Sequence, residues 1–170
     1  MVFVIKLLSA IGVINPILEK FRKENIVIST QESLLDKKQI VFNYMDSYDQ
    51  YVMKVHEIME GYNEGRLGVN EVYDAQKMLT DSISFTKESL NPLLVGLNEA
   101  IISYHDNLIS WLDTLVHPEQ ETINEAVLKL NGNRNQIMNE LVKVFNQVGI
   151  AYQYNDDSSI SYQRMNIRMK

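Results

Sequence analysis

Three polar side chains, spaced seven residues apart, are candidates for a chemical function in this sequence. Asn91, Asn98 and His105 form this row, and Leu112 continues its spacing. Because seven residues make about two turns of an α-helix, these side chains share one helix face. We favour buried, hydrogen-bonded groups that fix the register of helix packing. The alternative is a small polar pocket for a ligand, or a proton switch centred on His105.

His105 is followed directly by Asp106, and Asp113 lies on the same predicted helix. The pair resembles the core His-Asp pair of the helical metal-dependent phosphohydrolases, which implies a metal-dependent hydrolase. That family needs further spaced His and Asp ligands, which we cannot place in this sequence. The Glu-x-x-His motif of ferritin-like di-iron bundles and the His-Glu-x-x-His motif are also missing. We therefore expect no catalytic residue, no cofactor and no metal, and rank a His105/Asp106 ligand-binding protein or hydrolase third among our hypotheses.

Three tyrosines, Tyr44, Tyr48 and Tyr51, follow one side of another predicted helix. Tyrosine is enriched at the centre of protein interfaces. It also suits core packing, because the ring can be buried while the hydroxyl finds a polar partner. Core packing is the favoured interpretation. If any surface of the protein binds a partner, these three residues are the first place to look.

Apolar residues at spacings of four and three predict the elements that carry these side chains, three long helices at residues 30–62, 70–116 and 118–148. Ser29 and Glu32 form a capping box that predicts the start of the first helix. Pro92 interrupts the second, for which we expect a bent but continuous helix. The alternative is that Asn91 caps a new helix with Pro92 in its first turn.

The apolar face of the third predicted helix is interrupted at one position. Arg134 lies between Leu130 and Ile137, where the apolar spacing would place another hydrophobic residue. Together the helices predict an all-α, up-down-up bundle with an N-terminal helix and a short C-terminal tail. We expect one helical-bundle domain over residues 1–150, followed by a tail at 151–170. The tail is either irregular or a small β-hairpin, with residues 26–28 as an optional third strand.

The first eighteen residues are strongly apolar. Phe3, Leu7 and Ile14 lie on one side of a predicted helix, and packing of that side into the core is the favoured interpretation. The same side could instead contact a membrane or a partner. Our second hypothesis is therefore a membrane-peripheral or extracytoplasmic bundle attached through residues 1–18.

Composition narrows the classes of function. The formal net charge of -6 argues against a protein that grips a nucleic-acid backbone. Without cysteine there is no disulfide and no thiolate metal site. These facts leave the compartment open, with the cytoplasm favoured. The leading hypothesis is a non-enzymatic helical bundle that acts through protein–protein contact, either with a partner or by self-association along its coiled-coil-like seams.

Overall fold

The computed structural model describes residues 14–88, 91–117, 123–156 and 159–162, with side chains from residue 33 onward except at position 88. The helices are α2 Ile14–Asn63, α3 Val69–Ser82, α4 Phe85–Glu88, the 3-10 helix η1 Pro92–Leu94, α5 Val95–Val116 and α6 Ile123–Val148. Two short strands follow, β1 Tyr152–Tyr154 and β2 Ile160–Tyr162. The predicted all-α bundle with a short C-terminal tail is confirmed.

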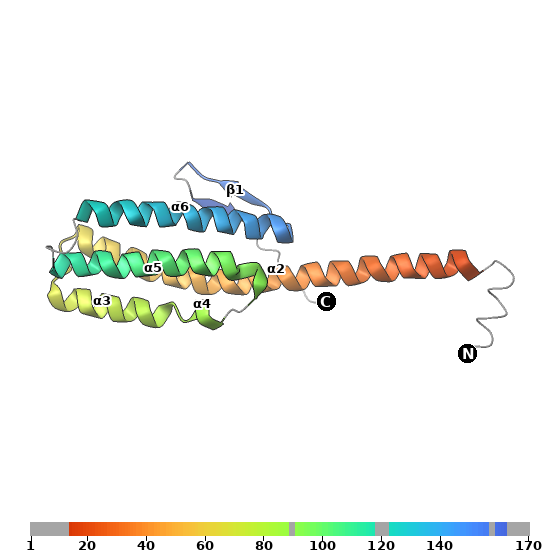
Figure 1. Ribbon diagram of the computed structural model, residues 1–170, viewed down its shortest axis with the longest axis horizontal. Coiled ribbons are helices and arrows are strands. Elements are labelled where there is room, and N and C mark those ends of the chain that lie inside the picture. The colour runs from red at the N-terminus through yellow and green to blue at the C-terminus, as the bar shows by residue number, and fades with distance from the viewer. Residues whose placement is uncertain (1–13, 89–90, 118–122, 157–158, 163–170) are drawn as a thin grey trace. The chain divides into compact units, whose positions relative to one another are not determined.

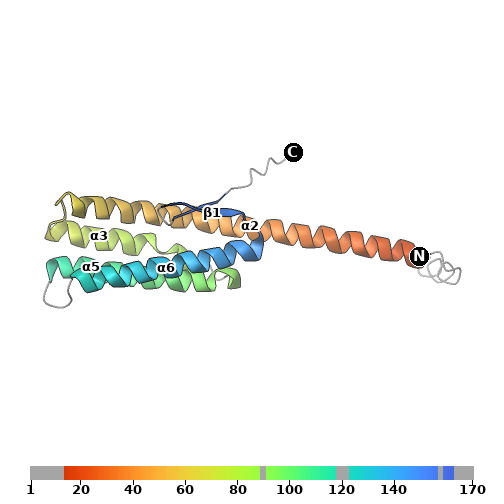
Figure 2. The same ribbon diagram turned by 90° about the horizontal axis from the view of Figure 1, so that it is seen from above.

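Contacts divide the chain into two units, residues 1–39 and residues 40–170, and the boundary falls inside α2. The second unit contains the bundle. Within this unit α2 and α5 run in one direction while α3 and α6 run in the other (Figures 1 and 2). This is the alternation that short turns between successive helices impose.

The first long helix begins earlier than predicted. Its backbone is helical from Ile14, so Ser29 and Glu32 lie inside α2 and do not cap it. Residues 26–28, expected as a strand or connector, are helical as well. No Gly or Pro interrupts the chain between Pro16 and Gly61. β-branched residues lower helix stability by only about 0.7 kcal/mol or less each, which a long helix tolerates.

The predicted continuous helix over residues 70–116 is wrong, because α3 ends at Ser82 and α5 begins at Val95. Pro92 cannot donate a backbone hydrogen bond, and it disfavours the helical conformation at the residue before it. Asn91 accordingly has an extended backbone, with φ -70° and ψ 124°. Its side chain accepts a hydrogen bond from the Leu93 amide at 2.9 Å and caps η1. The alternative with Asn91 as a cap is the correct one.

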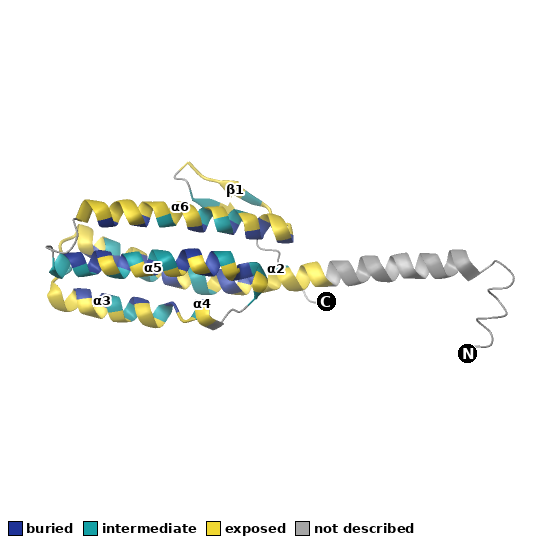
Figure 3. Ribbon diagram, in the orientation of Figure 1, coloured by how far each residue is buried: buried dark blue, intermediate teal, exposed yellow. Residues whose placement is uncertain are grey.

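α5 is the central helix of the bundle, since it packs against both α3 and α6. Figure 3 shows buried positions along much of its length. Its fully buried apolar side chains are Leu94 just before it, Leu97, Ala100, Ile101, Leu108, Trp111 and Leu112. A face this wide has to meet more than one neighbour, which explains the central position.

The C-terminal tail forms a hairpin, one of the two alternatives expected for it, and the hairpin packs on the bundle. β1 and β2 are antiparallel, with Tyr152 opposite Tyr162. The hairpin has two strands in the described part of the chain, so the optional third strand from residues 26–28 is wrong. The Tyr162 ring lies 6.4 Å from Phe42 of α2 and 5.0 Å from Phe145 of α6, centroid to centroid. The hairpin therefore bridges α2 and α6 at this end of the bundle.

Candidate functional site

The two sets of polar residues singled out in the sequence meet in the core. The Tyr44 hydroxyl donates a hydrogen bond to Asn98 Oδ1. The Tyr51 hydroxyl and His105 Nδ1 are hydrogen-bonded at 3.3 Å. We call these four residues the polar ladder. Both pairs are separated by 54 positions, as parallel helices in constant register require.

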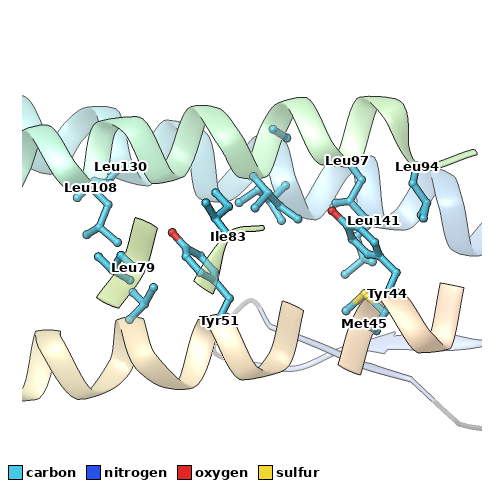
Figure 4. Close-up of a cluster of buried hydrophobic side chains, with 14 of the residues drawn as sticks. Tyr44, Met45, Tyr51, Leu79, Ile83, Leu94, Leu97, Leu108, Leu130 and Leu141 are labelled. Atoms are coloured by element: carbon cyan, nitrogen blue, oxygen red, sulfur yellow. The ribbon is translucent and has the colours of Figure 1, made fainter. Parts of the chain in front are cut away.

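Heptad spacing on both helices positions the polar ladder. Tyr44 and Tyr51 are seven residues apart on α2, as are Asn98 and His105 on α5. Each tyrosine therefore meets the polar residue at the same level of the parallel helix. Figure 4 shows the hydroxyls of Tyr44 and Tyr51 pointing from α2 toward α5 among buried leucines. Sliding one helix by half a heptad would bury these hydroxyls against apolar side chains, so the pairs disfavour that register.

Burial keeps the polar ladder uncharged. Desolvation raises the pKa of the Tyr44 and Tyr51 phenols well above the usual range, because a phenolate would lose its hydration there. Desolvation also lowers the pKa of the His105 imidazole, opposed by Asp106 and aided by Lys87 of α4. The ladder is thus a set of neutral hydrogen bonds in the core.

The structure also describes Asn91, the remaining residue of the predicted row, and the His-Asp pair of the metal hypothesis. Asn91 is half-buried and caps η1, so it is not part of the polar ladder. Asp106 is exposed although its neighbour His105 is buried. Among the residues that the structure describes, no group of three or more His, Asp or Glu side chains could hold a metal ion.

The three tyrosines considered as a partner surface differ in how far they are buried. Tyr44 and Tyr51 are 5% and 1% exposed, so neither offers an appreciable surface to a protein partner. Tyr44 also packs edge-on against Phe85, with ring centroids 5.2 Å apart. Tyr48 is half-buried and lines a surface groove. The candidate for partner contact among the three is therefore Tyr48.

The groove lies between α2 and α6, has a volume of about 400 Å³ and is mainly apolar. We call it the α2–α6 groove. From α2 it is lined by Tyr48, Tyr51, Val52, Val55, His56 and Met59. From α5 and α6 it is lined by Tyr104, Val127, Leu130, Asn131, Arg134 and Ile137. The groove thus joins the tyrosine side of α2 to the seam of α6.

Polar groups of the α2–α6 groove concentrate around Arg134. Tyr48, Tyr104 and Arg134 all line the groove. Burial raises the pKa values of Tyr48 and Tyr104, and the Arg134 guanidinium opposes both shifts. On the α2 side, His56 Nε2 lies 3.2 Å from Glu60 Oε1. Sequence reasoning marked Arg134 only as a break in an apolar seam. The tertiary packing places it in one groove with two phenols, which come from different helices.

The predicted contact residues at the N-terminus lie largely outside the described chain. Phe3 and Leu7 are among residues 1–13, which the structure does not describe. Ile14 is the first residue of α2. In the described part of the chain, no helix combines the length and the apolar character needed to cross a membrane.

Comparison with known proteins gives no relative. No family model, no curated protein and no solved structure matches this chain. Functional inference therefore rests on the polar ladder and the α2–α6 groove.

The lowered pKa of His105 predicts a loss of stability in mild acid. In the unfolded chain the imidazole takes up its proton near pH 6.5, whereas folded His105 does so only at lower pH. Below that unfolded value the unfolded state binds more protons, so the free energy of unfolding falls with pH until the folded pKa is passed. We expect urea denaturation to show this fall between about pH 7.5 and about pH 5.5.

Replacing His105 by Gln removes the titrating group but retains hydrogen-bonding atoms for Tyr51. The variant should lose less stability between the two pH values than the natural protein does. His56→Gln is the matched control, because its side chain is exposed at 72%. It should retain the natural pH dependence. An unchanged pH dependence in the His105 variant would contradict the assignment.

Proposed function

We propose that this chain is a non-enzymatic helical bundle that acts by protein–protein contact on the side where the α2–α6 groove opens. The observation that carries the proposal is a pair of exposed apolar side chains along this opening. Val52 of α2 is 42% exposed, and Val127 of α6 is 39% exposed. Both side chains line the groove. We call these two residues the groove rim.

The hairpin supports the proposal because it already fills part of the space between α2 and α6. At one end Tyr162 lies against Phe42 and Phe145. Farther along, between residues 48–59 of α2 and residues 127–137 of α6, the groove stays open. A partner segment carrying apolar side chains would cover the groove rim as Tyr162 covers the closed end, and it would bury apolar area that water now contacts.

The polar ladder supports a structural rather than catalytic use of the core polar residues. A general base needs to reach the proton that it abstracts. Nδ1 of His105 is hydrogen-bonded to Tyr51, and both residues are buried. Their mutual contact fits a role in fixing the α2–α5 register, which in turn positions the groove rim.

Site-specific photocrosslinking in the source cells tests the proposed surface. A photoreactive phenylalanine analogue placed at Val52 or at Val127 should crosslink to a defined protein, which includes a second copy of this chain. Tyr73 is the control position, because it is 50% exposed and lies on α3, away from α6 (Figure 1).

Crosslinks from the groove rim but not from Tyr73 are the expected result, and Val52→Asp should abolish those formed from position 127. Sedimentation equilibrium of the purified chain then separates self-association from binding of another protein. Equal crosslinking from all three positions would contradict the groove rim as the contact surface. A strict monomer with no crosslink from any position would contradict the proposed function itself.

A further inference from the structure

One end of the α2–α6 groove gathers hydrogen-bond donors from three helices. Tyr48 comes from α2, Tyr104 from α5 and Arg134 from α6, and all three line the groove. Arg134 is exposed, while the two phenols are half-buried. A guanidinium presents a rigid fork of donors that matches a carboxylate, and a phenol can donate to the same group.

Toward its other end the groove is lined mainly by apolar side chains, with His56 and Asn131 among them. α2 and α6 are antiparallel, so residues after Tyr48 on α2 face residues before Arg134 on α6 (Figure 1). Val55 and Met59 therefore line the same end as Val127 and Leu130. From Arg134 back to Val127 the helix rises by about 10 Å, at about 1.5 Å per residue. Arg134 and the two phenols therefore lie toward one end of the groove, and apolar side chains predominate toward the other.

Charge in the groove is opposite to that of the whole protein. The formal net charge of the chain is -6. The groove lining nevertheless includes the cation Arg134, and no Asp or Glu lines it in the described chain. Carboxylates next to it include Glu60, which contacts His56, Asp49, which acts on Tyr48, and Asp106, which acts on Tyr51. The lining therefore favours an anion, although the surrounding surface is acidic.

We propose that the α2–α6 groove binds a small organic anion with an aliphatic body, of the medium-chain carboxylate class. Arg134, Tyr48 and Tyr104 hold the carboxylate, and the aliphatic chain lies against Val55, Met59 and Leu130. A volume of about 400 Å³ lies within the range of small-molecule sites. This site is the interior of the groove and does not depend on a protein contacting the groove rim.

Isothermal titration calorimetry with sodium decanoate as the probe tests the site on the full-length chain. Decanoate should bind, and Arg134→Gln should weaken its binding about tenfold, which corresponds to about 1.4 kcal/mol. Arg66→Gln is the matched control, because it removes an equal charge from an exposed arginine that does not line the groove. It should leave decanoate affinity unchanged. Tyr48→Phe should weaken binding by a smaller factor.

Two further probes separate the contribution of the carboxylate from that of the aliphatic body. Decanol has the aliphatic body without the carboxylate, and acetate has the carboxylate without the body; both should bind more weakly than decanoate. Circular dichroism should show that the variants keep the helical content of the natural protein. Absence of decanoate binding would overturn the proposal, as would equal loss in the Arg66 and Arg134 variants. Equal affinity for decanol and decanoate would show apolar adsorption only and would overturn it too.

Discussion

Leu108→Ala lowers the free energy of unfolding by about 2–5 kcal/mol. Leu108 is fully buried on the central helix α5, in one hydrophobic core with Leu79 of α3 and Leu130 of α6 (Figure 4). Truncation removes buried methyl groups and leaves a cavity that the surrounding helices can only partly fill. Because domains are stable by only about 5–15 kcal/mol, this loss is a large share of the total.

Urea denaturation followed by tryptophan fluorescence measures the effect of Leu108→Ala. The chain has one tryptophan, Trp111, which is buried on the same helix. Ile102→Ala is the matched control, because Ile102 also lies in α5 but is 38% exposed. It should change the free energy of unfolding by less than about 1 kcal/mol. Equal losses from the two substitutions would contradict the central position of α5.

The polar ladder predicts a second large effect on stability. The loss caused by replacing one residue of a pair depends on whether its partner is replaced as well. Tyr44→Phe removes the hydroxyl that donates to Asn98 Oδ1 and leaves that oxygen buried without this donor. We expect a loss of about 1–3 kcal/mol. Asn98→Leu leaves the Tyr44 hydroxyl without its acceptor and should cost a similar amount. Replacing both residues restores an apolar match, so the double variant should be more stable than the less stable of the two single variants.

A double-mutant cycle measures this coupling by urea denaturation. The two substitutions should show an interaction free energy of about 0.5–3 kcal/mol, since the residues are in contact. Tyr73→Phe is the control for loss of an exposed hydroxyl, and it should stay within about 0.5 kcal/mol of the natural protein. Strictly additive losses for Tyr44→Phe and Asn98→Leu would show that the ladder does not act as a pair.

Local rules explain how much of the fold could be predicted. Apolar residues at spacings of four and three identify the helices without reference to their neighbours, because only a helix places them on one side. Alternation in residues 152–162 likewise predicts the hairpin. The break before α5 could also be anticipated, since Pro92 follows Asn91. The prediction of a continuous helix was wrong because the apolar spacing continues on both sides of Pro92. Spacing alone does not show whether the backbone between two apolar stretches is helical.

The predicted start of the first long helix at Ser29 was wrong for a related reason. A capping box at Ser29 is a local signal, and it acts only where the preceding backbone leaves the helix. In α2 the residues before Ser29 are themselves helical, so the amides that a cap would satisfy already have partners in the preceding turn. Local capping signals therefore compete with helix continuity, and continuity prevails here.

The sequence by itself determined that the fold is helical, that the stretch after Pro92 has the widest apolar face, and that Asn98 and His105 share that face. Tertiary structure alone decided that Tyr44 and Tyr51 are their partners, 54 positions earlier in the chain. It alone placed Arg134 of α6 in one groove with Tyr48 and Tyr104. Periodicity specifies one face of one helix, whereas a pair or a groove depends on which faces meet and in what register. That outcome depends on packing between distant segments.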